Sequence, residues 1–190
     1  MEILTLVFGA IFVNNFILSR FLGICPFIGV SKKIETSLGM GAAVTFVMIV
    51  SSAVTWMINH WVLIPFEMGY LSTIAFIVVI ASLVQFIEMF LKKYVPTLYS
   101  TLGVFLPLIT TNCAILALSV MNMDNNYSFF MSVVHAVGAG IGFTLAIVLF
   151  GSIRERLDRS DILPHFRGVP IALLTAGLMA IAFMGFTGMI

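Results

Sequence analysis

Six apolar stretches divide the chain, and each is long enough to cross a lipid bilayer as a helix. They lie near residues 3–24, 37–58, 70–91, 98–121, 128–150 and 169–189. The hydrocarbon core of a bilayer needs about 20 helical residues, and a helix satisfies its own backbone hydrogen bonds in lipid. These stretches lack the alternation of apolar and polar residues that is typical of strands. The pattern therefore predicts an all-α membrane protein with six transmembrane helices.

The composition supports this prediction and excludes several classes of soluble protein. Hydrophobic residues make up 61% and charged residues 9% of the 190 residues, whereas soluble domains have about 45–50% and about 25%. So few charges cannot cover a soluble enzyme or form the basic face of a nucleic-acid binder. The sequence has no P-loop, no dinucleotide-binding glycine fingerprint with an acidic partner and no catalytic-triad pattern. Its first residues lack the basic start of a removable signal peptide.

The positions of the basic residues predict how the helices are oriented. All nine lie at or in the first, third and fifth connections: Arg20, Lys32, Lys33, Lys92, Lys93, Arg154, Arg156, Arg159 and Arg167. Cytoplasmic loops are enriched in Lys and Arg. We therefore expect these three connections in the cytoplasm and both termini on the outer side. We place Arg20 near the cytoplasmic end of the first helix, where its side chain reaches the lipid–water interface.

Six helices divide into two halves of three, near 1–95 and 96–190, within a single integral membrane domain. Related halves with three helices each must be inverted with respect to the membrane. A short pattern of Gly, Gly and Thr occurs at Gly39–Thr45 and again at Gly138–Thr144. The repetition has two interpretations, which are an inverted repeat and the small residues that pack membrane helices in general.

The first stretch of each half contains residues that interrupt helices. The first holds Asn14, Asn15, Cys25 and Pro26, and the fourth holds Pro107, Thr110, Thr111, Asn112 and Cys113. Proline removes a backbone donor and kinks or breaks a helix. Interrupted helices at matching positions of two halves indicate a binding site in inverted-repeat membrane proteins. We therefore expect the first and fourth helices to be broken.

Cys25 and Cys113 are the two cysteines of the chain, and they allow more than one interpretation. A free cysteine is often a small buried hydrophobic residue. Membrane burial and a reducing compartment argue against a disulfide between them. Two thiolates from this chain and two from a partner would complete the four-sulfur shell of a [2Fe–2S] cluster.

Other polar residues in the apolar stretches have both a packing and a functional interpretation. Asn14, Asn15 and Asn112 form hydrogen bonds between helices or line an ion route. Glu88 forms a surface ion pair with Lys92, four residues later, or takes part in ion passage. His135 is expected to be a hydrogen-bonded packing residue.

Several sequence blocks resemble the A-type subunit of Rnf complexes. They are Val13–Asn15, Phe21–Phe27, Gly29–Lys33, Gly103–Ala114, Ile153–Arg156 and Thr175–Met179. The resemblance covers nearly the whole chain, and the blocks around the two cysteines are specific. The E-type subunit of the sodium-translocating NADH:quinone oxidoreductase is related but less similar. Ala117 stands where the family commonly has Gly, which affects local packing and leaves both cysteines in place.

The resemblance implies a subunit of a bacterial or archaeal complex in the cytoplasmic (inner) membrane. Such complexes couple electron transfer between ferredoxin and NAD to the transport of Na⁺ or H⁺. The A-type subunit pairs with a homologous E-type subunit of opposite orientation, and each contributes two cysteines to one intramembrane [2Fe–2S] cluster. Cys25 and Cys113 are the matching residues here. NAD and flavin are expected on other subunits, among B, C, D and G, so the chain is not catalytic alone.

Two other functions remain open from the residues themselves. A secondary transporter could use the broken helices to bind a solute, but this function leaves the cysteines unexplained. A purely structural membrane subunit would tolerate the loss of both cysteines.

Overall fold

The structure is a computed structural model that describes residues 2–31, 33–65, 69–94, 106–160 and 167–186. The regular structure of these residues is entirely helical, as the apolar stretches predict. Its elements are α1 (Glu2–Phe8), the π-helix η1 (Gly9–Val13), α2 (Ile24–Val30), α3 (Ile34–Ile58), the π-helix η2 (Asn59–Leu63), the 3₁₀ helix η3 (Gly69–Leu71), α4 (Ser72–Tyr94), α6 (Leu106–Thr110), α7 (Cys113–Asp124), α8 (Phe129–Asp158) and α9 (Val169–Met184). Residues 98–105 of the expected fourth helix lie outside the described residues.

Three helices of the described part are long and apolar enough to cross a membrane: Ile34–Leu63, Gly69–Met89 and Phe129–Asp158. The other apolar helices are shorter. The first stretch is divided between α1–η1 and α2, and the fourth between α6 and α7. The breaks expected in the first and fourth helices are therefore present, although six complete spans are not seen.

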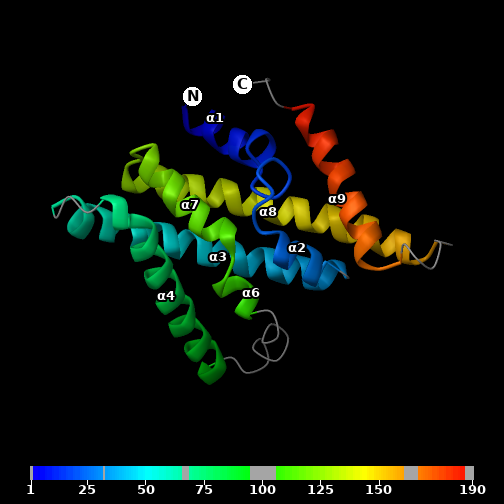
Figure 1. Ribbon diagram of the computed structural model, residues 1–190, viewed down its shortest axis with the longest axis horizontal. Helices are drawn as coiled ribbons and strands as arrows, with labels where there is room; N and C mark the ends of the chain where they lie inside the picture. The colour runs from blue at the N-terminus through cyan, green and yellow to red at the C-terminus, as the bar shows by residue number, and fades with distance from the viewer. Residues whose placement is uncertain (1, 32, 66–68, 95–105, 161–166, 187–190) are drawn as a thin grey trace.

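Helices α3 and α8 form the antiparallel centre of the molecule (Figure 1). Glycines allow the two backbones to approach closely. A Cβ atom on Gly41 would lie 2.6 Å from Thr144 Cγ2, and a Cβ atom on Gly140 would lie 2.5 Å from Thr45 Cγ2. The Oγ1 atoms of Thr45 and Thr144 are 3.4 Å apart. The contact is thus reciprocal, as expected if the repeated Gly and Thr pattern lies around a local pseudo-twofold axis.

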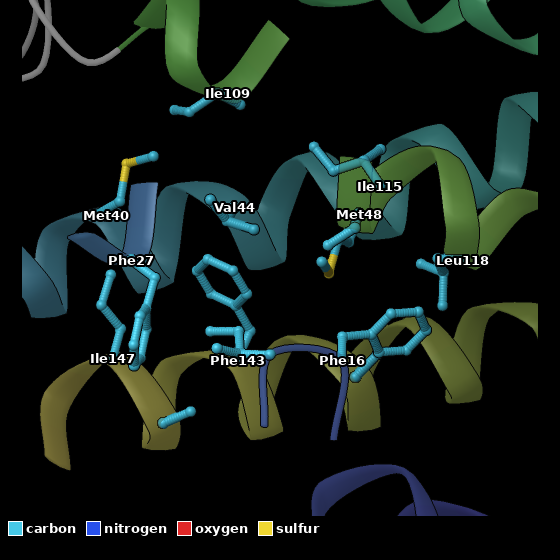
Figure 2. Packing of buried hydrophobic residues seen from close by; sticks show 14 of the residues in the cluster. Phe16, Phe27, Met40, Val44, Met48, Ile109, Ile115, Leu118, Phe143 and Ile147 are labelled. Atoms are coloured by element: carbon cyan, nitrogen blue, oxygen red, sulfur yellow. The ribbon is translucent and has the colours of Figure 1, made fainter. Parts of the chain in front are cut away.

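The hydrophobic core lies along this helix pair and includes side chains from both breaks (Figure 2). Phe16 comes from the first break and is 1% exposed. Phe27 of α2 stacks on Phe150 of α8 with ring centroids 4.1 Å apart. Ile115 of α7 is fully buried. Packing of these side chains holds the short helices against α3 and α8, so their ends are fixed in space.

Candidate metal centre

The first break is organised by the side chain of Asn15. Its Oδ1 accepts hydrogen bonds from the backbone N–H of Ile17 at 3.1 Å and of Leu18 at 3.3 Å, as the first residue of a helix does. Its Nδ2 donates to the carbonyl of Gly142 in α8 at 2.9 Å and to Ile11 O at 3.0 Å. Asn15 is fully buried. The predicted interhelical hydrogen bond is therefore present, and it ties the break to α8.

The same turn ends in a backbone cap. Leu22 N–H donates to Phe16 O at 2.8 Å, and Phe21 N–H donates to Ile17 O at 3.1 Å. Phe21 has a φ of +57°, the left-handed conformation that usually belongs to glycine at a helix end. Residues 15–22 thus form one isolated turn with a cap at each end, which places the next residues in a fixed direction.

The second break is a short gap before α7. Asn112 is the N-cap residue of α7, and its Oδ1 accepts from Ala114 N–H at 3.0 Å. Its Nδ2 is buried and has no hydrogen-bond partner among the described residues. Thr111 is exposed, and its hydroxyl donates to Pro107 O at 2.9 Å. Asn112 therefore positions the first turn of α7, which starts at Cys113.

A hydrogen bond joins the two breaks. The backbone N–H of Gly23 donates to Cys113 Sγ at 2.9 Å. Gly23 has a φ of +80°, and a Cβ atom there would lie 3.0 Å from Phe143 Cε2 and 3.3 Å from Asn112 Oδ1. Glycine is required at this position by both the conformation and the close approach.

Cys25 is the second residue of α2, and Cys113 is the first residue of α7. Two residues of extended chain span at most about 7 Å, so Cys25 lies close to Gly23 and to the second break. Both thiols are free and exposed. Each lies at the N-terminal end of a helix, where partial positive charge favours an anionic sulfur ligand.

The two prolines do not interrupt the helices themselves. Pro26 is buried in the first turn of α2, and Pro107 is the exposed second residue of α6. The first turn of a helix tolerates proline because the missing N–H has no partner there. The prolines therefore mark helix starts, and the first break lies before Pro26, at Asn14 to Gly23.

The described residues contain no group of three or more His, Cys, Asp or Glu side chains that could hold a metal ion. Cys25 and Cys113 are two free thiols, which is half the number of ligands in a four-thiolate set. Gly23 also supplies an N–H donor to sulfur, and such hydrogen bonds tune iron–sulfur clusters. The residues present therefore fit a cluster that is shared with another chain.

The other sequence candidates lie away from this pair. Glu88 is half-buried on α4, and the structure does not test its predicted pairing with Lys92. Asn14 is exposed and lines a cavity beside the first break. Thr110 is half-buried at the end of α6.

Arg20 lies beside a connection that the sequence predicts on the other side of the membrane. The isolated turn directs it to a cavity that is also lined by Asn125 and Tyr127, which connect α7 to α8. The sequence count places that connection on the opposite side of the membrane from the cytoplasm.

A second polar cluster was missed from the sequence. Asn122 Nδ2 donates to Ser52 Oγ at 2.8 Å, and Asn122 Oδ1 lies 2.6 Å from His135 Nδ1. His135 is thus hydrogen-bonded, as predicted. The cluster borders a cavity of about 240 Å³, whose lining also includes Thr55 and Ser119. The available signal was the placement of Asn and Ser residues within apolar stretches, which membrane helices keep where they are paired.

The family model for "Rnf-Nqr subunit, membrane protein" matches residues 3–190. The chain belongs to the Rnf-Nqr family. One Rnf-Nqr relative, from Acetobacterium woodii, is named as the A-type subunit of a "Na(+)-translocating ferredoxin:NAD(+) oxidoreductase complex" and is 59% identical over 189 residues. Relatives from Syntrophotalea carbinolica, 58% identical, and Aeromonas hydrophila, 52% identical, are named as the A-type subunit of an "Ion-translocating oxidoreductase complex". Each alignment covers 100% of this chain and 98% of the relative.

Proposed function

We propose that this chain is an electron-relay subunit of a redox-driven ion pump in the bacterial or archaeal cytoplasmic membrane. Cys25 and Cys113 would supply two of the four thiolate ligands of a [2Fe–2S] cluster, and a homologous E-type subunit would supply the other two. The names of the full-length relatives, which are subunits of ion-translocating oxidoreductase complexes, support this role. The coupling ion is Na⁺ or H⁺.

The hydrogen bond from Gly23 N–H to Cys113 Sγ is the observation that carries the proposal. It connects the break before Cys25 to the break before Cys113, so both thiols belong to one surface region. When bound, the cluster would accept and release one electron at a time within the membrane. Gly23 donates to the sulfur, and Asn112 fixes the turn that presents it. NAD and flavin would bind to the other subunits, B, C, D and G.

The chain would form one membrane domain of two inverted halves, with both termini outside. The reciprocal contacts of Gly41 with Thr144 and of Gly140 with Thr45 support related halves. Two free and exposed cysteines support a partner that completes the ligand set. Alone, the chain would not be catalytic.

The alternatives are a secondary transporter and a purely structural membrane subunit. The transporter predicts solute uptake without a redox partner. The structural subunit predicts a working complex after both cysteines are replaced by alanine. Neither gives a reason for two exposed thiols at the starts of broken helices.

The test is low-temperature electron paramagnetic resonance on the dithionite-reduced complex from cells carrying Cys25→Ala or Cys113→Ala. We expect each variant to lose the same [2Fe–2S] signal and two iron atoms per complex, because removal of either ligand opens the cluster. Ferredoxin-dependent NAD reduction should then stop.

Ser19→Ala is the matched control, since Ser19 is an exposed residue of the same break. It should keep both the signal and the electron transfer. Subunit composition is measured on each preparation, so that loss of a partner is separated from loss of the cluster. An unchanged spectrum with full iron content in both cysteine variants would refute the ligand assignment.

A further inference from the structure

A cavity of about 650 Å³ lies between the N-terminal helix, the first break and the turn that joins α7 to α8. Its walls differ in character. Leu6 and Val13, from the α1–η1 helix, line an apolar wall. Asn14, Arg20 and Asn125 line a polar wall. A pocket with one apolar side and a few polar groups fits an amphipathic molecule.

Arg20 carries the one full charge among the described residues that line this cavity. Its guanidinium makes no ion pair and no hydrogen bond within the described part of the chain. Asp124 precedes Asn125 in the chain, but it is exposed and does not line the cavity. A positive charge among membrane helices costs free energy unless an anion pairs with it or water solvates it.

The fold fixes the position of this charge. Arg20 belongs to the isolated turn that Asn15 begins and Phe21 ends. Phe21 keeps a left-handed conformation at φ +57°, which is unfavourable for a side chain of its size. The hydrogen bonds of this turn fix the backbone next to Arg20, so Arg20 stays in the lining of the cavity.

A second donor and an apolar surface complete the site. The side-chain amide of Asn14 makes no hydrogen bond within the described residues and is therefore free to donate. His135 also lines the cavity, but its Nδ1 is already paired with Asn122. On α1, Leu4 is 79% exposed, so the helix that supplies the apolar wall also presents an apolar side chain on the molecular surface.

We propose that this cavity binds the phosphate group of an anionic phospholipid, with its acyl chains along α1–η1. Arg20 would pair with the phosphate oxygens, and Asn14 Nδ2 would donate a second hydrogen bond. Arginine is suited to this contact because its planar guanidinium forms paired hydrogen bonds with phosphate. The site is separate from the cysteine pair, so it does not depend on the proposed cluster.

The test uses the complex purified in detergent and stripped of lipid, and measures its thermal unfolding midpoint against added lipid. Phosphatidylglycerol should raise the midpoint of the wild type at lower concentration than phosphatidylcholine, whose headgroup has no net charge. Arg20→Gln should need about tenfold more phosphatidylglycerol for the same shift, which is the scale of one charged hydrogen bond. Arg20→Lys should lie between them.

Two further variants separate binding from folding. Leu6→Trp fills the apolar wall, keeps Arg20 and should also weaken the response. Arg159→Gln removes an exposed arginine that pairs with Glu155 outside this cavity, and it should respond as the wild type does.

Three results would overturn the proposal. In the first, Arg20→Gln and the wild type respond equally to phosphatidylglycerol. In the second, inorganic phosphate at the same concentration gives the full shift, which would indicate a soluble anion. In the third, Arg20→Gln releases a partner subunit on size-exclusion chromatography while phosphatidylglycerol leaves the wild type unchanged. Arg20 would then pair with a carboxylate of that partner.

Discussion

At the scale of single residues, Arg154 connects α8 to the short helix that carries Cys25. It is 7% exposed. Its Nη1 donates to Ile28 O at 2.7 Å and to Ser31 Oγ at 3.3 Å. These acceptors lie in the last turn of α2 and directly after it, where carbonyl groups lack helical partners and a cation is favourable. Arg154 therefore holds α2 in place from its C-terminal end.

Replacing Arg154 with Met should destabilise the chain by about 2–3 kcal/mol, because it removes charged hydrogen bonds and leaves the partly buried carbonyl of Ile28 without this donor. In a chain of this size, that corresponds to a lower unfolding midpoint by about 5–10 °C. Differential scanning fluorimetry of the purified complex measures the change. Arg156→Met is the control, since Arg156 is exposed on the same helix. Equal midpoints for the two variants would show that the Arg154 contacts add nothing.

The sequence identifies the residue types at the candidate metal centre but not their contacts. Two cysteines near Asn and Pro residues indicate interrupted helices, and Asn15 makes the expected hydrogen bond to another helix. Asn112 instead caps its own helix. The bond from Gly23 to Cys113 joins residues 90 positions apart. Such a contact depends on how both breaks pack against α8, and this packing cannot be predicted from the hydropathy pattern. The sequence does not predict the burial of Arg154 for the same reason, because basic residues in a connection between helices are expected to be exposed to solvent.

At the scale of helices, the contact between α3 and α8 depends on glycines with no space for a side chain. A Cβ atom on Gly41 would lie 2.6 Å from Thr144 Cγ2, whereas one on Gly39 would have no neighbour within 4 Å. Thr144 cannot move easily, because its hydroxyl donates to Gly140 O at 2.8 Å and its branched side chain has few rotamers in a helix.

Gly41→Ala should therefore destabilise the chain by about 1–3 kcal/mol through overpacking. Gly39→Ala is the matched control on the same helix, and it should be neutral or stabilising by up to about 1 kcal/mol, since alanine is the better helix former. Thermal unfolding of the purified complex compares the two. Adding Thr144→Ala to Gly41→Ala should restore part of the lost stability. A stable Gly41→Ala variant, or no rescue, would contradict the close contact.

Helix positions are predicted well where a stretch is uniformly apolar, and less well at its ends. The stretch near 37–58 becomes a helical run over Ile34–Leu63, and the stretch near 128–150 becomes Phe129–Asp158. Helices continue into polar residues when those residues find partners, as Arg154 does. The break of the first stretch lies earlier than the proline suggests, because Asn15 offers the backbone an alternative to the helix.

At the scale of the whole molecule, the antiparallel pair of α3 and α8 gathers basic residues at one end. A Cβ atom on Gly151 would lie 2.9 Å from Ser37 Oγ, so the start of α3, just after Lys33, lies beside the last turns of α8. At the other end, Trp56 Nε1 donates to Tyr127 O at 3.0 Å. Basic residues at one end and aromatic residues with a polar edge at the other are typical of a helix pair that crosses a membrane.

The position of the basic residues predicts the side of the membrane on which the C-terminus lies. If the basic end is cytoplasmic and the chain makes the six crossings that its apolar stretches predict, the C-terminus lies on the outer side. Alkaline phosphatase, which is active only outside the cytoplasm, should be active when fused after Ile190, and a green fluorescent protein at the same place should stay dark. Fusions after Ser160, following the C-terminal end of α8, should give the opposite result. The physical reason is that Arg154, Arg156 and Arg159 resist transfer across the membrane.

A fluorescent fusion after Ile190, with inactive phosphatase there, would mean either a reversed orientation or an odd number of crossings. The Ser160 fusions separate these two cases, because only reversal would make the phosphatase at Ser160 active.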